Sequence, residues 1–128
     1  MAWSAYYVLR SPAPLTAAQE AALREHGRSW SERLSEDCDG YAYDAGDAFD
    51  DDDTELPPGT DVRSGCTKVG DEDSDTASAD MIQIFEAVEE LAGMFPTTEL
   101  FVSDDRAYPD RTAAKDLGDF RAKVKALE

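Results

Sequence analysis

The sequence predicts an α+β fold in which an antiparallel sheet carries helices on one face. Segments rich in aromatic and β-branched residues, typical of strands, alternate with segments whose apolar residues recur at helical spacing. Pro and Gly residues lie between them, where turns are needed. With 128 residues, of which 41% are hydrophobic, the chain is long enough to bury one core. We therefore expect a single domain over residues 1–128.

The first strand is expected at residues 3–9, WSAYYVL, and two prolines end it. Thr16 and Gln19 then have the spacing of a capping box, in which each side chain satisfies a backbone N–H at the start of a helix. Gly27 weakens this helix by about 1 kcal/mol relative to Ala, which leaves open an early end there. One apolar face is expected from Leu23, Trp30 and Leu34.

Two further strands are expected in the middle of the chain, at residues 40–49 and 61–70. Gly46 marks a bulge in the first of them. The connection between them contains four consecutive aspartates, followed by Pro57, Pro58 and Gly59, which favour a turn. We expect acidic loops at about 50–60 and 70–79.

The most regular apolar pattern predicts a helix over residues 80–95, with Asp80 as its N-cap and Pro96 as its end. Its apolar stripe consists of Met81, Ile84, Phe85, Val88, Leu91, Ala92 and Phe95. A strand at 98–103 follows. Thr112 then opens a last helix, whose apolar positions are Leu117, Phe120, Val124 and Leu127. The order β-α-β-β-α-β, followed by a C-terminal helix, is that of the ferredoxin-like arrangement.

Acidic residues are concentrated in one part of the chain. The formal net charge is −17, from 29 acidic and 12 basic residues. Residues 36–80 hold sixteen Asp and Glu against Arg63 and Lys68, a net charge of −14. Such a surface repels nucleic-acid phosphates and anionic membranes, so neither is expected as a partner.

A regional acidic face favours binding to a basic protein, because charge complementarity accelerates association. The carboxylates expected to form it are Asp44, Asp47, Asp50, Asp51, Asp52, Asp53, Glu55 and Asp61. Tyr41 and Tyr43 lie on the neighbouring predicted strand, and they are the candidate aromatic anchors of the interface.

A divalent-cation site is the alternative use of these carboxylates. Asp71, Asp73 and Asp75 have the spacing of the first three ligands of an EF-hand loop. However, Thr76 stands where that loop requires Gly, and Ile82 stands where it requires Glu. The cluster is therefore a candidate for a weak calcium or magnesium site only. No cofactor is expected.

The catalytic patterns in the sequence are weak. Asp104 and Asp105 follow a predicted strand, but the chain has no Gly-rich phosphate-binding loop, so they are interpreted as a turn in which Asp caps the backbone. His26 is the only histidine and is expected beside the core. We therefore expect a protein that is not an enzyme.

The apolar pattern and the N-terminal residues favour a cytoplasmic protein, and this expectation bears on the state of the cysteines. No apolar run approaches the roughly 18 residues of a membrane-spanning helix, and the first residues do not resemble a signal peptide. Cys38 and Cys66 are then expected as reduced thiols, although a disulfide between them stays open at this stage.

In size, acidity and element order, the chain resembles the small acidic bacterial toxin-immunity proteins. That resemblance implies direct binding to a cognate toxin, with an immunity- or inhibitor-type role, and it assigns no individual residue. Two alternatives stay open. One is the divalent-cation protein, and the other is a housekeeping domain, of halophilic origin or not, whose acidic residues serve solvation.

Overall fold

The computed structural model describes residues 2–36, 38–46, 55–71 and 76–127. The chain order of its elements is β1 (Ala2–Ser11), α1 (Ala17–Ser31), β2 (Asp44–Ala45), β3 (Asp61–Asp71), α2 (Ala77–Met94), β4 (Glu99–Asp104), β5 (Thr112–Ala113), the 3-10 helix η1 (Ala114–Asp116) and α3 (Phe120–Lys125).

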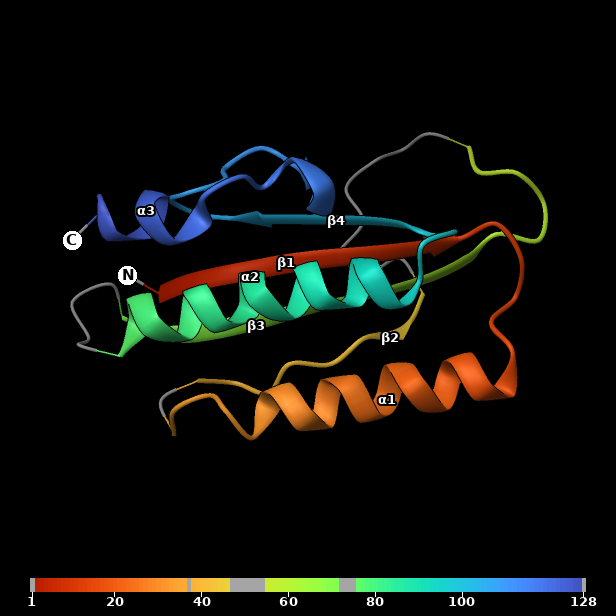
Figure 1. Cartoon of the computed structure of the whole chain (residues 1–128), viewed down its shortest axis with the longest axis horizontal. Helices are drawn as coiled ribbons and strands as arrows, with labels where there is room; N and C mark the ends of the chain where they lie inside the picture. The colour runs from red at the N-terminus through yellow and green to blue at the C-terminus, as the bar shows by residue number, and fades with distance from the viewer. Residues whose placement is uncertain (1, 37, 47–54, 72–75, 128) are drawn as a thin grey trace.

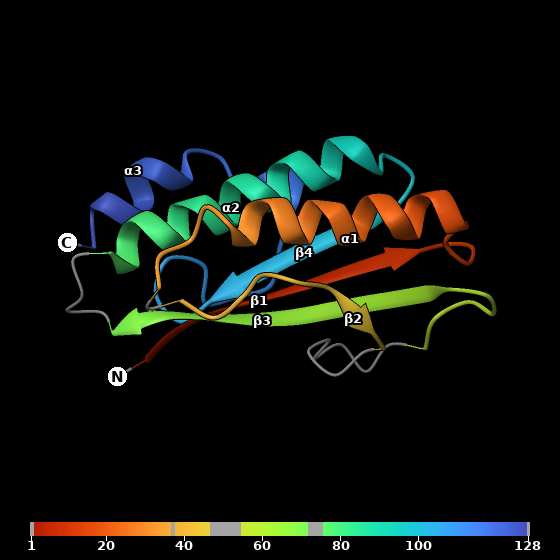
Figure 2. The same cartoon turned by 90° about the horizontal axis from the view of Figure 1, so that it is seen from below.

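The strands form one antiparallel sheet in the order β2-β3-β1-β4-β5. β1 is central and pairs with β3 over its whole length, from Ala2↔Asp71 to Ser11↔Asp61. The helices lie together on one face of this sheet (Figure 1, Figure 2). The predicted α+β class and the β-α-β-β-α-β order are confirmed, and β5 adds a short strand at one edge.

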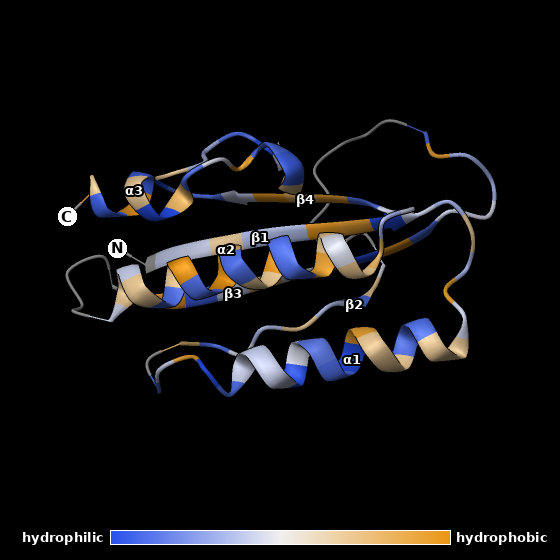
Figure 3. Cartoon of the chain, viewed as in Figure 1, coloured by the Kyte–Doolittle hydropathy of each residue, from blue (hydrophilic) through white to orange (hydrophobic). Residues whose placement is uncertain are grey.

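The core lies between the sheet and the helices. Alternate residues of β1 point into it, because successive side chains of a strand face opposite sides. These residues, Trp3, Ala5, Tyr7 and Leu9, are fully buried. From α2 the predicted stripe is buried, apart from Ala92, which is half-buried. Figure 3 shows the hydrophobic colouring in bands along α2 and on parts of β1 and β4.

Helix α1 begins as predicted and ends at Ser31, between the early end at Gly27 and the last residue of its expected apolar face, Leu34. The Gln19 backbone N–H donates to Thr16 Oγ1, and the Thr16 N–H donates to Gln19 Oε1, which completes the capping box. The early end at Gly27 is wrong, since the helix continues to Ser31. A Cβ at Gly27 would lie 3.1 Å from the Tyr41 carbonyl oxygen, so glycine permits a close approach of the neighbouring chain.

Within residues 40–46 of the strand predicted at 40–49, only the two residues of β2 form a strand, and residues 47–49 lie outside the described part of the chain. Tyr41 turns into the core instead of continuing a regular strand, as described below. Gly46 has a φ of +109° and directly follows β2. Its N–H still donates to the Val62 carbonyl of β3, and no bulge is found between β2 and β3 in their described pairs.

The predicted acidic loops are only partly described. Residues 55–60 form a loop, whereas residues 70–71 complete β3 and residues 77–79 open α2. Residues 47–54 and 72–75 lie outside the described part of the chain.

Helix α2 begins at Ala77, so Asp80 is not its N-cap. Thr76 occupies that position. Asp80 lies in the first turn and is 4% exposed, and its carboxylate accepts hydrogen bonds from the backbone N–H and the hydroxyl of Ser35. It therefore fixes the segment that follows α1 rather than its own helix end.

The last predicted helix is shorter than expected. Thr112 and Ala113 pair with β4, and α3 begins only at Phe120. Gly118 has a φ of +63°, which interrupts a right-handed helix, and the Asp119 carboxylate then caps α3 by accepting from the Ala122 N–H. Phe120 and Val124 are buried as predicted.

Candidate acidic interface

The predicted acidic face is not one continuous patch among the described residues. Asp44 is exposed on β2, at one edge of the sheet. Glu55 is also exposed, but its neighbour Leu56 lines a hollow together with Thr97 and Glu99, at the start of β4. The remaining members of the expected face, apart from Asp61, lie outside the described residues: Asp47, Asp50, Asp51, Asp52 and Asp53.

Asp61 is engaged within the protein. Its carboxylate accepts a hydrogen bond from the Leu15 N–H at 3.0 Å and forms an ion pair with Arg63, with 3.0 Å between Oδ1 and Nε. Arg63 lowers the pKa of Asp61 below its ordinary value. Glu20 forms a second ion pair with the same guanidinium, with 2.9 Å between Oε1 of Glu20 and Nη1 of Arg63. Asp61 thus anchors β3 to the start of α1 and neutralises Arg63.

The segment between α1 and β2 carries acidic residues that the sequence-based face omitted. Glu36 and Asp39 are exposed, and they have no side-chain partner among the described residues. The Asp39 N–H donates to the Lys68 carbonyl at 2.9 Å, so this segment runs beside β3. Asp44 pairs with Ser64 four residues further along β3. We call Glu36, Asp39 and Asp44 the acidic edge.

The acidic edge is held to the protein by backbone contacts and by one buried tyrosine. The Tyr41 N–H donates to Ser31 Oγ at 2.8 Å, and the Ser31 hydroxyl donates to the Tyr41 carbonyl at 2.9 Å. At the far end, the Gly46 N–H donates to the Val62 carbonyl at 2.9 Å. These contacts hold the backbone of residues 39–46 against α1 and β3 (Figure 2).

Tyr41 cannot serve as a surface anchor, because it is only 1% exposed. Its hydroxyl donates to the Tyr43 hydroxyl at 3.0 Å and lies 2.9 Å from Nε2 of His26. Burial raises the pKa of Tyr41 well above its ordinary value. The tyrosine is a core residue with satisfied polar contacts, and the prediction of an anchor at this position is wrong.

Tyr43 remains a candidate anchor. It is half-buried and lines a groove of about 340 Å³ between α1 and β2. Tyr7 lies beneath it, with ring centroids 4.7 Å apart. Asp44 lines the same groove, so an aromatic ring and a carboxylate of the acidic edge are adjacent there.

Three arginines also line this groove: Arg24, Arg28 and Arg63. Two of them are neutralised within the protein. Arg28 forms ion pairs with Glu25 and Glu32 on its own helix, and Arg63 is held as described above. Arg24 is exposed and has no acidic partner among the described residues, so it is the cation of the groove that a partner would meet.

His26 connects α1 with α2 through the core. Its Nδ1 lies 3.2 Å from an Oε2 of Glu90, and the Trp30 indole N–H donates to the same carboxylate. Burial lowers the pKa of His26 below its ordinary value, and Glu90 opposes that shift. The imidazole therefore joins Tyr41 to Glu90, which lie on different segments of the chain.

The metal-site prediction falls mostly on residues outside the described part of the chain. Asp73 and Asp75 lie there, and only the backbone of Asp71, at the end of β3, is described. Within the described ranges, no three His, Cys, Asp or Glu side chains are grouped so that they could hold a metal ion.

Asp104 has the turn role that the sequence predicted. Its carboxylate is 2% exposed and accepts from the backbone N–H groups of Arg106, Ala107 and Tyr108, and from the Trp3 indole at 2.7 Å. The Ser4 N–H donates to Asp105 at 2.9 Å. Both carboxylates are thus used to join the loop after β4 to β1.

The cysteines are free thiols, as expected. Cys66 pairs with Tyr6 in the sheet, on the face opposite Tyr7 and the core. Burial raises the pKa of Cys38 to about 12 and raises that of Cys66 as well, so neither thiol is activated as a nucleophile. No helix in the described ranges is both long and apolar enough to cross a membrane.

Comparison of the chain with protein-family models, with curated proteins and with solved structures gives no significant match.

Proposed function

We propose that this chain is a non-catalytic binding protein that engages a basic protein partner through the acidic edge. The observation that carries the proposal is the group of exposed carboxylates on the segment that joins α1 to β2, at Glu36, Asp39 and Asp44, of which Asp39 and Asp44 lie beside β3. Their carboxylates are exposed and have no described partner, whereas the nearby Arg63 is already neutralised. Aligned charges of one sign steer an oppositely charged partner into register.

Tyr43 and its groove supply the apolar part of this interface in our proposal. Exposed ion pairs contribute only about 0.2–1 kcal/mol each, so charge alone favours fast but weak association. An aromatic ring beside the carboxylates adds contact area at small entropic cost. The specific form of the proposal is an immunity- or inhibitor-type protein of the cytoplasm, which blocks a basic enzyme by covering it.

The test is affinity capture from source-cell lysate at 50 mM and 500 mM NaCl, followed by measurement of Kd with the purified partner. A triple variant of the acidic edge (Glu36→Gln, Asp39→Asn, Asp44→Asn) is compared with a charge-matched control (Glu89→Gln, Asp110→Asn, Asp116→Asn), which alters exposed acidic residues elsewhere. We expect the edge variant to weaken Kd on the order of tenfold, and the control much less.

Two results would contradict the proposal. Equal weakening by both triple variants would mean that net charge, rather than the acidic edge, governs binding. Failure of the unaltered protein to retain a basic protein at 50 mM NaCl would remove the interaction role itself. If a partner is retained, an assay of its own activity with and without this chain distinguishes an inhibitor from a simple binder.

A further inference from the structure

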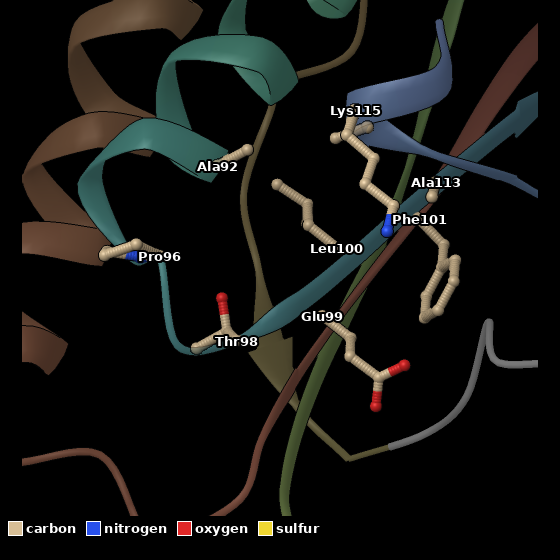
Figure 4. A pocket seen from close by; sticks show the side chains of 9 residues that line it. Ala92, Pro96, Thr98, Glu99, Leu100, Phe101, Ala113 and Lys115 are labelled. Carbon is tan, nitrogen blue, oxygen red and sulfur yellow. The ribbon is translucent and has the colours of Figure 1, made fainter.

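A cavity of about 390 Å³, the largest that the described residues line, lies at the edge of the sheet opposite the acidic edge (Figure 4). One wall is formed by the end of α2 and the turn after it, where Thr98 donates its N–H and its hydroxyl to the Phe95 carbonyl. The floor is β4, and the other wall is the segment that joins β5 to η1. Pockets of this size hold small ligands.

Small side chains leave this cavity unfilled. Three alanines line it, Ala92, Ala113 and Ala114, and Pro96 and Leu100 extend its apolar surface. Apolar atoms around an unfilled space lack the dispersion contacts that they make in a packed core. A hydrocarbon group that enters the cavity restores these contacts and leaves water. The lining therefore favours a ligand with an apolar body.

One cation without a partner lines the same cavity. Lys115 is exposed, forms no ion pair among the described residues, and extends its ammonium group toward β4 (Figure 4). Glu99 is also exposed and unpaired, but successive side chains of a strand face opposite sides, and its carboxylate points away from Leu100 (Figure 4). A ligand that lies against Leu100 is therefore offered a cation, whereas the nearby anion is turned away from it.

The local charge also admits an anion. Residues 106–125, which contribute Lys115, hold six basic and three acidic side chains, whereas residues 36–80 hold two and sixteen. The acidic edge lies at the other side of the sheet, beside β2 and β3. Salt screens repulsion over such separations, since the Debye length is about 8 Å at physiological ionic strength. The net charge of −17 therefore does not exclude an anionic ligand at this cavity.

We propose that this cavity binds a small apolar monocarboxylate. The hydrocarbon part of the ligand lies against Ala92, Leu100 and Ala114, and its carboxylate pairs with the Lys115 ammonium group. An apolar interior with a single charged group that fixes orientation is a usual composition of small-ligand sites. A second carboxylate would lie in the apolar interior or beside Glu99, so dicarboxylates are disfavoured.

This site does not depend on the acidic edge, and either proposal can fail while the other holds. The probe is hexanoate, titrated into the ¹⁵N-labelled chain. We expect saturable amide shifts at Leu100, Ala114 and Lys115, with a Kd on the order of millimolar for so small a ligand. Hexanol and hexylamine carry the same hydrocarbon chain without the carboxylate, and each should bind at least about threefold more weakly.

Two lysine variants test the charged contact. Lys115→Gln should weaken hexanoate binding by about threefold or more, because it removes the ion pair while the polar side chain stays similar in length. Lys125→Gln changes the net charge equally at an exposed position on α3, and it should bind as the unaltered protein does. Equal weakening by both variants would mean that hexanoate responds to overall charge, and would overturn the role of Lys115.

A third variant tests the cavity itself. Ala92→Leu fills it from a half-buried position on α2 and should abolish the shifts. Its thermal unfolding shows whether the fold is retained, and if it is not, the ligand series and Lys115→Gln still decide. The proposal is overturned if no saturable shift occurs at millimolar hexanoate, if the shifts lie on another surface, or if hexanol binds equally well. Tighter binding of hexylamine would also overturn it, because Glu99 would then be the deciding charge.

Discussion

At the level of single residues, burial and the Glu90 carboxylate have opposite effects on the pKa of His26. Tyr41 donates its proton to Tyr43, so Nε2 of His26 is the donor toward Tyr41. The buried Nδ1 then has no hydrogen bond within the described chain, although a Glu90 oxygen lies 3.2 Å away. Protonation would give Nδ1 a charged partner, but burial disfavours the imidazolium, and burial has the larger effect on the pKa.

This balance predicts a specific pH dependence of stability. The folded-state pKa of His26 lies below its ordinary value of 6.5, so the unfolded chain binds more protons just below that pH. The stabilisation by neutral His26 is therefore complete above about pH 6.5 and is lost as the pH falls. Each unit of depression corresponds to about 1.4 kcal/mol. Urea unfolding between pH 5.5 and 7.5 should show a loss in the unaltered protein that is smaller in His26→Gln.

Glu90 provides the control for this prediction. The other charged or titratable groups near the imidazole are the Arg33 guanidinium and Tyr41, and burial raises the pKa of Tyr41 well above its ordinary value. Glu90→Gln removes the carboxylate that raises the pKa of His26, so the acid loss should become steeper. If both variants lose stability on acidification in parallel with the unaltered protein, the pH dependence comes from the many surface carboxylates and not from His26.

At the level of elements, two glycines set how closely the segment before β2 approaches the core. Gly27 on α1 faces the Tyr41 carbonyl, and Gly65 on β3 faces Ala42 and Tyr7. A Cβ at Gly65 would lie 2.1 Å from the Ala42 carbonyl oxygen and 2.5 Å from the Tyr7 ring. Because one of these contacts is with backbone, the acidic edge would have to move away from β3 to accommodate it.

We therefore predict that Gly65→Ala destabilises the fold by roughly 2 kcal/mol or more, in the range of overpacked cores. Gly93→Ala is the matched control. It lies in α2 with nothing within 4 Å of the added Cβ, and it should stabilise the fold by about 0.4–1 kcal/mol. The measurement is urea unfolding of both variants at pH 7.5. A Gly65→Ala variant as stable as the unaltered chain would mean that the edge segment is not held against β3 as described.

The elements that could be predicted are those whose determinants are local. The capping box at Thr16 and the stripe of α2 depend on residues three and four positions apart, and both were found where the sequence placed them. The prediction of a regular strand around Tyr41 was wrong, because the burial of Tyr41 depends on its contacts with His26 and Ser31 of α1. The predicted start of the last helix at Thr112 was wrong. The apolar spacing there does not indicate that Thr112 and Ala113 pair with β4, or that Gly118 interrupts the helix.

The same limit applies to the candidate site. The regional charge was visible in the sequence, and Asp44 is exposed as that charge suggested. The internal role of Asp61 could not be seen, because it depends on Leu15 and Arg63 meeting in the folded state. Glu36 and Asp39 could have been included, since both lie within the acidic region of residues 36–80. Composition predicted how many carboxylates lie there, but not which ones face solvent.

At the level of the whole molecule, the two sheet edges differ in character. The β2 edge presents exposed carboxylates at Asp39 and Asp44, whereas the β5 edge presents an apolar cavity and a lysine. The net charge of −17 is unevenly distributed along the chain. Residues 36–80 carry −14 of it, whereas the remaining residues carry thirteen acidic and ten basic side chains. Repulsion is therefore concentrated around the acidic edge, and this arrangement has a consequence for stability as well as for binding.

Neutralising the acidic edge should stabilise the isolated protein at low salt. In water, two like charges about 10 Å apart repel by roughly 0.4 kcal/mol, and the acidic edge belongs to residues 36–80, which carry a net charge of −14. The edge triple variant should therefore gain on the order of 1 kcal/mol over the unaltered chain in 10 mM NaCl, and the gain should shrink in 500 mM NaCl, where screening acts within a few ångströms. The control variant at Glu89, Asp110 and Asp116 should gain less, because basic side chains are more frequent in its part of the chain. Thermal unfolding of both triple variants at both salt concentrations measures this difference. Equal gains in the edge variant and the control variant would show that the repulsion is spread over the whole surface, as expected of a halophilic protein.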